Sequence, residues 1–398
     1  MVGVLLADEG EKRVRLRLRW VFTHRILTRI RHPVRVPIPP ASSSKRPRWP
    51  VIVVSVAVSL AIAGGGIAVA AWVSGDSPHE FAASTTAEGL SSTDGTVAPT
   101  TPVTVALPKL SDYVSPDQQS AVGISVMTFT DLTRSTPARG DRETLTTRPL
   151  TVTVRYPTAG MPSEEEIPDA PAYAPAPLIL FAHGFDSSSQ RYSSLLHDLA
   201  ASGFVVAAPE FPMSSTVFDG APDEYEIPEQ TRDLSFLITA MTGSDAPPVL
   251  AAMIAPGPVG LVGHSDGAVT ALLAGYAPRF ADSRVAAVAA ISGDFDTFGG
   301  EWFTTSDPPL LAIHGEFDEI NPFESSETLV ENDPGPAMLV MVQGASHLGS
   351  AIDPETEPAV ARLIAFDFLW RLTGSTDSMM QTQAAASTSP LELVSRHD

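Results

Sequence analysis

One five-residue turn limits what this chain can fold into more than any other stretch. Gly263-His-Ser-Asp-Gly267 follows the apolar run Pro258-Val-Gly-Leu-Val262 and leads into the helical pattern Val269–Tyr276. A G-x-S-x-G turn between a strand and a helix holds its serine in a strained backbone conformation. The residues two positions away must then be small, and Gly263 and Gly267 meet that need. We therefore predict that Ser265 is a nucleophile raised clear of a β-sheet.

Strand-like and helix-like segments alternate around this turn. The interior strand segments are apolar on both faces, which is typical of a mostly parallel sheet covered by helices. The predicted strands are 122–130, 149–156, 178–182, 204–208, 259–263, 285–292, 310–313 and 337–342, and the predicted helices are 192–202, 229–241, one from about 322, and 357–372.

Two residues downstream fit the partners that a serine nucleophile needs. A serine hydroxyl requires a base, usually histidine, and the base requires an orienting carboxylate. His347 follows the final predicted strand in a loop of small residues, and Asp318 ends the run Leu310–Asp318. The chain order Ser265, Asp318, His347 is that of α/β-hydrolase triads. His264 flanks the nucleophile but is expected to point elsewhere.

Other carboxylates compete with Asp318 for the role of the acid. Asp294 and Asp296 follow the preceding strand in Ser292-Gly-Asp-Phe-Asp296 and are the main alternative, and Glu316 is a more distant one.

Two backbone N–H groups are candidates for an oxyanion hole. The Asp266 N–H lies at the N-terminus of the predicted helix after the nucleophile, where it can donate to a developing oxyanion. The second donor is expected after the strand Leu178–Ala182, where Gly184 permits close approach and the Phe185 N–H follows.

Several stretches together resemble the α/β-hydrolase superfamily, in particular its dienelactone hydrolase-like and platelet-activating-factor acetylhydrolase-like serine esterases. The resemblance covers about residues 122–372 and implies ester hydrolysis through an acyl-enzyme, without a cofactor or a metal. The polyester-cleaving relatives usually carry Met after the nucleophile, where this chain has Asp266. The stretches that carry the resemblance are Leu150–Pro157, Leu178–Phe185, Leu199–Pro209, Thr231–Phe236, Gly263–Gly267, His314–Asp318 and Gly344–His347.

The N-terminal third predicts a membrane topology. Residues 1–49 hold twelve Lys or Arg and three Asp or Glu, whereas the whole chain has a net charge of −21. A basic arm before an acidic body is a topology signal rather than a nucleic-acid signal. Val51–Trp72 contains no charge and would span roughly 33 Å as a helix, which matches a bilayer. We expect a single-pass signal anchor with an extracytoplasmic catalytic domain, the alternative being secretion after signal cleavage.

These patterns divide the chain into five parts. They are a basic cytoplasmic segment (1–49), a transmembrane signal anchor (50–73), a flexible Ser/Thr/Pro-rich tether (74–120), an α/β-hydrolase catalytic domain (121–372) and a disordered tail (373–398). The acidic loop Pro212–Pro228 is either a partial lid over the site or a solvated surface loop.

Composition narrows the function further. The chain has no cysteine, which excludes disulfides, a thiol nucleophile and thiolate metal sites. The leading hypothesis is a membrane-anchored serine hydrolase that cleaves a small-molecule or lipid ester. The alternatives are an acyltransferase or serine peptidase on the same fold, or a non-catalytic envelope scaffold. The natural substrate and the oligomeric state are not predicted.

Overall fold

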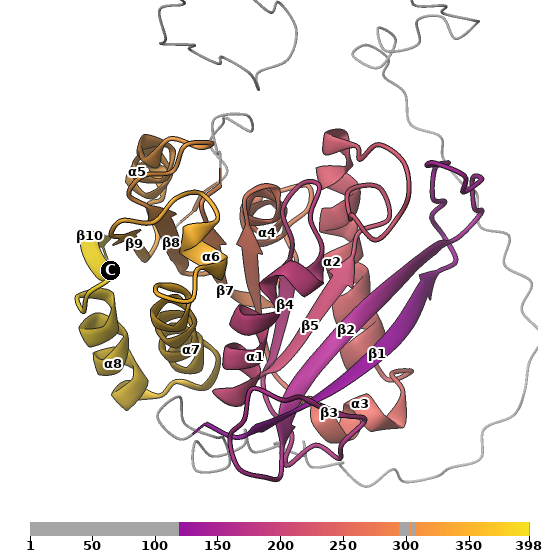
Figure 1. Ribbon diagram of the computed structural model, residues 1–398, viewed down its shortest axis with the longest axis horizontal. Coiled ribbons are helices and arrows are strands. Elements are labelled where there is room, and N and C mark those ends of the chain that lie inside the picture. The colour runs from indigo at the N-terminus through magenta and orange to yellow at the C-terminus, as the bar shows by residue number, and fades with distance from the viewer. Residues whose placement is uncertain (1–118, 294–302, 305–306, 398) are drawn as a thin grey trace, which may run out of the picture. The chain divides into compact units, whose positions relative to one another are not determined.

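A mixed β-sheet forms the centre of the computed structural model, which describes residues 119–293, 303–304 and 307–397. Within these residues the sheet has ten strands in the order β10-β9-β8-β7-β6-β4-β5-β2-β1-β3 (Figure 1). The strands are β1 Ala121–Asp131, β2 Arg148–Thr158, β3 Ile167–Pro168, β4 Leu178–Ala182, β5 Val205–Glu210, β6 Val259–His264, β7 Val285–Ile291, β8 Leu310–Gly315, β9 Ala337–Val342 and β10 Leu391–His397.

The central strands, β4 to β9, pair in parallel, and antiparallel pairs flank them. β2 pairs antiparallel with β5, β1 with β2, and β10 with β9. Alternate side chains of a strand point to opposite faces, and both sets are buried here. In β4, Leu178 and Leu180 contribute to one apolar core, whereas Ile179 and Phe181 contribute to the other.

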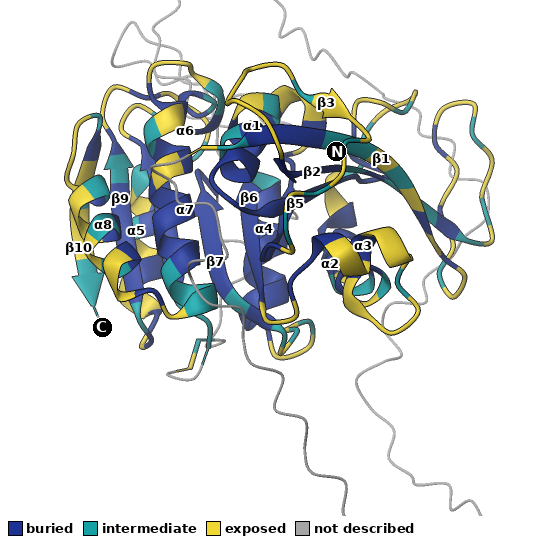
Figure 2. Cartoon of the chain, turned by 90° about the horizontal axis from the view of Figure 1, so that it is seen from below, coloured by how far each residue is buried: buried dark blue, intermediate teal, exposed yellow. Residues whose placement is uncertain are grey.

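Helices cover both faces of the sheet and bury these two cores. α1 and α7 pack on one face, with α6 and α8 beside them, and α2, α3, α4 and α5 pack on the other (Figures 1 and 2). The helices are α1 Ser193–Ala201, α2 Ile227–Thr242, α3 Pro248–Met253, α4 Asp266–Tyr276, α5 Phe323–Asn332, α6 Gly349–Ile352, α7 Glu357–Thr373 and α8 Thr376–Ala386, with 3₁₀ turns at Ser189–Tyr192 and Glu224–Glu226.

This architecture confirms the predicted α/β-hydrolase fold with a mostly parallel sheet. The strand predicted over 337–342 is β9 with the same bounds, and the helix predicted over 357–372 is α7 extended by one residue. The sequence did not predict α3, α6 or the two-residue strand β3.

The predicted disordered tail, residues 373–398, is wrong. Gly374 ends α7 in the left-handed conformation that commonly ends a helix. The chain then forms α8 and returns as β10, which pairs with β9 from Leu391↔Val342 to His397↔Ala337. β10 hydrogen-bonds to β9. Leu391, the first residue of β10, and Ala386, the last residue of α8, are both buried in the apolar core. The α/β-hydrolase fold therefore continues beyond residue 372, and neither β9 nor α7 is its last element.

The predicted basic segment, transmembrane anchor and nearly all of the predicted tether lie outside the described residues. Among the residues that the structure does describe, no helix has both the length and the apolar character needed to cross a membrane.

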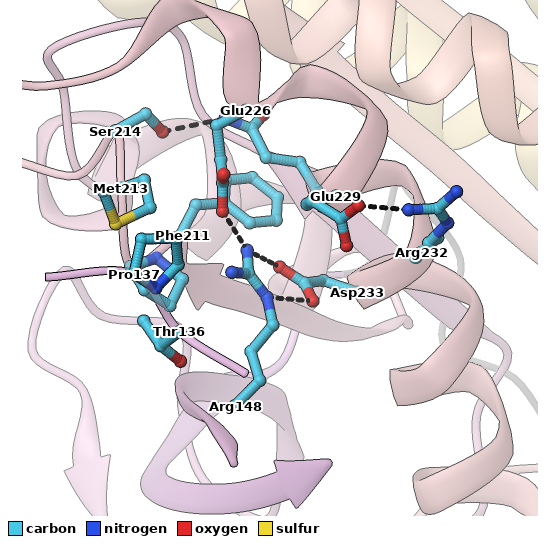
Figure 3. Close-up of polar contacts among 12 residues, drawn as sticks. Thr136, Pro137, Arg148, Phe211, Met213, Ser214, Glu226, Glu229, Arg232 and Asp233 are labelled. Atoms are coloured by element: carbon cyan, nitrogen blue, oxygen red, sulfur yellow. Dashed lines mark hydrogen bonds and ion pairs between the residues drawn. The ribbon is translucent and has the colours of Figure 1, made fainter. Parts of the chain in front are cut away.

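A buried cluster of charged side chains ties β2 to α2 and to the acidic loop. The Arg148 guanidinium donates to both Asp233 carboxylate oxygens at 2.7 Å and also contacts Glu226 (Figure 3). The side chains of Arg148 and Asp233 are 1% and 0% exposed. Burial raises the pKa of Glu226 to about 7, although the Arg148 charge opposes this. Arg134 donates to Asp233 at 2.6 Å, so one carboxylate is shared by two guanidinium groups.

The acidic loop predicted over Pro212–Pro228 is buried at its start and exposed further along. Its first four residues are buried, and the Arg139 guanidinium donates to the carbonyls of Pro212 and Ser215 at 3.2 and 2.9 Å. Asp219 and Glu224, by contrast, are exposed. The first part of the loop is therefore fixed by internal contacts and the acidic part is exposed to solvent, while the partial lid stays a prediction.

We predict that Leu391→Ala lowers the stability of the protein although it lies in the polar C-terminal segment. Leu391 is 3% exposed, and truncating a buried leucine costs about 2–5 kcal/mol. The midpoint of thermal unfolding should fall by roughly 5–10 °C. Val394→Ala in the same strand, where the side chain is 40% exposed, is the matched control. Equal midpoints for the two variants would contradict a docked β10.

Arg148→Met should lower the stability of the protein strongly, although methionine is itself suited to a buried position. The substitution leaves the buried Glu226 and Asp233 carboxylates without this guanidinium, and breaking a buried ion pair costs about 3–5 kcal/mol. Thermal unfolding should shift down by roughly 5–15 °C. Arg232→Met breaks the exposed pair with Glu229 on the same helix and should change stability by less than about 1 kcal/mol. A small shift for Arg148→Met would show that the cluster contributes little.

Candidate active site

Ser265 occupies the turn between β6 and α4 in a conformation that few non-glycine residues adopt. Its φ is 56° and its ψ is −125°, a strained combination of the kind found at functional sites. Two backbone hydrogen bonds fix the turn. The Ser265 N–H donates to the Ile291 carbonyl of β7 at 2.9 Å, and the Ala268 N–H donates to the Ser265 carbonyl at 2.9 Å. The predicted nucleophile therefore lies at a rigid turn and is itself only partly buried.

The two glycines of the turn are required by close packing. A Cβ atom on Gly263 would lie 2.0 Å from the Gly267 carbonyl oxygen. A Cβ atom on Gly267 would lie 2.0 Å from the carbonyl oxygen of Ala182, the last residue of β4. Because both neighbours are backbone atoms, a side chain at either position would force the turn open.

Asp318 and His347 come together at the carboxyl ends of β8 and β9. The His347 Nδ1 and the Asp318 Oδ2 are 2.8 Å apart. The Asp318 side chain is fully buried and His347 is 6% exposed. Since a carboxylate can only accept, the His347 Nδ1 carries the hydrogen and its Nε2 is left to accept a proton.

Asp318 is held by more than this one partner. Its Oδ1 accepts the backbone N–H groups of Ile320 and Asn321 at 2.9 and 2.8 Å. The His314 Nε2 lies 3.3 Å from its Oδ2. Burial alone would raise the pKa of the Asp318 carboxyl, but the hydrogen bonds outweigh burial and hold that pKa well below its usual range. The carboxylate is therefore ionised at any pH near neutrality.

Of the competing acids, Glu316 lies within the described residues and is directed away from His347. The Glu316 carboxylate is directed to the Gly344 N–H, at 2.9 Å. Asp294 and Asp296 lie outside the described residues.

The loop after β4 lies against the nucleophile. A Cβ atom on Gly184 would be 3.1 Å from the Ser265 Cβ and 3.2 Å from the His264 carbonyl oxygen. Gly184 therefore lies beside Ser265. Asp266, the other predicted donor, is the first residue of α4, an eleven-residue helix. Both predicted oxyanion donors thus lie on segments that border the serine.

Buried polar groups also hold the loop after β4 in place. The His183 Nδ1 is 2.8 Å from the Gly184 carbonyl, and its Nε2 accepts the Phe211 N–H at 3.2 Å. Burial lowers the pKa of His183, which keeps the ring neutral, as these two contacts require. Glu210 accepts the Ser189 N–H at 3.0 Å, so the loop is also tied to the end of β5.

Three buried side chains near the site were not assigned a role from the sequence. His314 contacts Asp318, while His264 and Tyr192 lie between Gly184 and His347. The sequence carried a signal for two of them. His264 and His314 stand at the carboxyl ends of β6 and β8, where the functional groups of parallel α/β sheets collect. Within the described ranges, no group of three or more His, Cys, Asp or Glu side chains is placed to hold a metal ion.

Comparison with known proteins agrees with this fold. A model of the alpha/beta hydrolase family matches residues 179–395, more than half of the chain. The chain is also similar to the solved structure of a ferulic acid esterase from Streptomyces cinnamoneus, with 18% sequence identity and a TM-score of 0.54. That match covers 71% of this chain and 98% of the esterase chain. At this identity the likeness concerns the fold alone, and no curated protein matches the sequence significantly.

The family match supports the resemblance drawn from the sequence at the level of the superfamily, while the dienelactone hydrolase-like subgroup stays a prediction. The matched segment runs from β4 through β10 and so includes every strand of the parallel core. On this family match and the fold that agrees with it, the chain belongs to the alpha/beta hydrolase family.

Proposed function

We propose that this protein is a serine hydrolase that cleaves carboxylic esters through an acyl-enzyme. Ser265 is the nucleophile, His347 the general base and acid, and Asp318 the group that orients His347. The Phe185 and Asp266 N–H groups stabilise the oxyanion. The single observation that carries the proposal is the 2.8 Å contact between the buried Asp318 and His347, at the sheet edge that bears the strained Ser265.

The reaction needs only these side chains and water. Ser265 Oγ attacks the ester carbonyl carbon while the His347 Nε2 takes its proton, and the oxygen of the resulting tetrahedral intermediate carries the negative charge. The alcohol leaves with the proton from His347. Water then repeats the sequence on the acyl-enzyme and releases the acid. Because Asp318 stays ionised, it stabilises the imidazolium in each half of the reaction.

The proposed substrate is a small-molecule or lipid ester. The resemblance to dienelactone hydrolase-like and platelet-activating-factor acetylhydrolase-like esterases supports this class, and the structural likeness includes an enzyme named as a ferulic acid esterase. Asp266 places a carboxyl group next to the acyl site, where polyester-cleaving relatives usually carry Met. This difference argues against polyesters.

We also propose that the enzyme is anchored in the cell membrane by Val51–Trp72, with the catalytic domain on the extracytoplasmic side. The support comes from the sequence: an uncharged stretch long enough to span a bilayer and a strongly basic segment before it.

Ser265→Ala should abolish activity, with a loss of about 10⁶-fold in kcat, because no other group can form the acyl-enzyme. The full-length protein in mild detergent would be assayed with p-nitrophenyl esters of increasing chain length and with methyl ferulate. A fluorophosphonate probe should label the wild type at Ser265 and leave the variant unlabelled. A wild type that neither hydrolyses these esters nor reacts with the probe would refute the proposal, whereas products formed only with an added alcohol acceptor would indicate acyl transfer.

Asp318→Asn should lower kcat by about 10³–10⁴-fold while leaving the fold intact. The amide cannot stabilise the imidazolium and favours the wrong tautomer of His347. The matched control is Glu316→Gln, two residues away, which should retain kcat within about twofold because Glu316 contacts Gly344 instead of His347. If the control lost as much kcat as Asp318→Asn, Asp318 would not be the orienting acid.

A further inference from the structure

A line of hydrogen bonds runs through His264, the residue that precedes the nucleophile. The His264 Nδ1 lies 2.9 Å from the Tyr192 hydroxyl oxygen, and its Nε2 lies 2.9 Å from the backbone carbonyl oxygen of His347. Both His264 and Tyr192 are 1% exposed. The Tyr192 hydroxyl in turn receives the Gly184 N–H at 3.4 Å, a long contact. The oxyanion loop and the base loop are thus joined through one imidazole.

The direction of each bond follows from the groups involved. The carbonyl oxygen of His347 can only accept, so the Nε2 of His264 carries the hydrogen. In a neutral ring the Nδ1 must then accept, and the Tyr192 O–H is its donor. Burial, together with the nearby His347, lowers the pKa of His264 to about 3, so the ring is neutral at every pH at which the protein would be assayed. His264 therefore acts as a fixed donor and acceptor rather than as an acid or base.

These bonds constrain His347 at a point that Asp318 does not reach. Asp318 holds the ring of His347 through Nδ1, whereas His264 holds its backbone carbonyl, which also accepts the Ser350 hydroxyl at 3.0 Å. The ring of His264 also lies against the ring of His347, with centroids 4.8 Å apart. The base loop is exposed just before the buried His347, at Gly344 and Ser346, so the position of His347 depends on such internal contacts.

We propose that His264 is a positioning residue for the hydrolysis reaction, which it serves by donating from Nε2 to the His347 carbonyl and so fixing the general base beside the nucleophile. This inference rests on the proposed function. His264 touches neither the reacting atoms nor the substrate in this role. Its loss should therefore lower kcat and leave KM nearly unchanged, since a displacement of about 1 Å in a catalytic group can cost 10²-fold in rate.

The experiment compares substitutions of His264 that separate its two bonds. His264→Gln places an amide N–H near the former Nε2 and keeps the bond to His347. His264→Asn has the same amide chemistry one methylene shorter, so it keeps a partner for Tyr192 but cannot reach His347. His264→Phe keeps the ring and loses both bonds. Tyr192→Phe removes only the hydroxyl at the other end of the line.

A matched control shows whether the loss of any buried hydroxyl bond has the same effect. Tyr276 is 2% exposed and donates to the Pro308 carbonyl at 2.8 Å, at the far end of α4 from Ser265. Tyr276→Phe should lower the thermal midpoint and leave kcat unchanged. All variants are measured as full-length protein for kcat, KM, fluorophosphonate labelling rate and thermal midpoint.

We expect kcat to fall about 10–100-fold in His264→Phe and His264→Asn, with KM changed by less than about threefold, and His264→Gln to recover most of the loss. Equal kcat for the Gln and Asn variants, or a wild-type kcat in the Phe variant, would overturn the inference while leaving the proposed function intact. If His264→Phe fails to fold, the Gln and Asn pair decides the question alone. A wild type that is inactive on esters and unlabelled by the probe would instead refute the proposed function, and the inference with it.

Discussion

The site depends on how closely the backbone of the serine turn approaches the strand beside it. Gly267 packs so tightly against the Ala182 carbonyl that no side chain can be accommodated, and its Cβ position is also 2.8 Å from the His183 carbonyl. Ala182 and His183 lead directly into the loop that carries Gly184 and Phe185. One backbone contact therefore fixes both the position of Ser265, the proposed nucleophile, and the position of the loop that borders it. The central place of β6, between β4 and β7, makes this contact possible.

The sequence predicted the parallel core well because its strands are short apolar runs bounded by turn residues, and short length and flanking turns distinguish a buried strand from a buried helix. It also brought out Asp318 and His347, since each follows such a strand directly. No pattern in the sequence predicted how the Asp318 carboxylate is held. Its Oδ1 is held by the backbone N–H groups of Ile320 and Asn321, and every residue except proline carries such a group.

The C-terminal segment, predicted to be a disordered tail, shows where prediction from the sequence failed and why. β10 is an edge strand, and Leu391 is the only one of its residues classed as buried, while Glu392, Val394 and Ser395 are exposed. Half of its hydrogen-bonding groups pair with β9, a strand about fifty residues earlier in the chain. A segment stabilised mainly by backbone pairing to a distant strand shows little hydrophobic periodicity of its own. It therefore resembles a disordered polar tail when it is considered alone.

Two kinds of interaction hold the strands and helices around the site, namely apolar packing and buried guanidinium groups. The parallel core around β6 and β8 is held by apolar packing. On the antiparallel side, guanidinium groups that each bridge several partners act together with buried apolar side chains such as Leu150 and Val152. Arg148 joins β2 to α2, and Arg139 donates to the backbone carbonyls of Pro212 and Ser215. The fork of an arginine suits this task because it fixes direction as well as distance. These bonds hold α2 against β2 and fix the backbone of the segment 212–215.

His264 and Ser265 are neighbours in the chain, so the same turn carries the proposed positioning residue and the proposed nucleophile. His264 immediately precedes Ser265, so a displacement of the strained turn moves the nucleophile and the donor of the His347 carbonyl bond together. Asp318 contacts His347 through the ring Nδ1. If the base were held by Asp318 alone, a shift of the turn would change the distance between nucleophile and base directly. In the proposed arrangement the bond from His264 links the base loop to the turn itself, so a shift of the turn would carry the base with it.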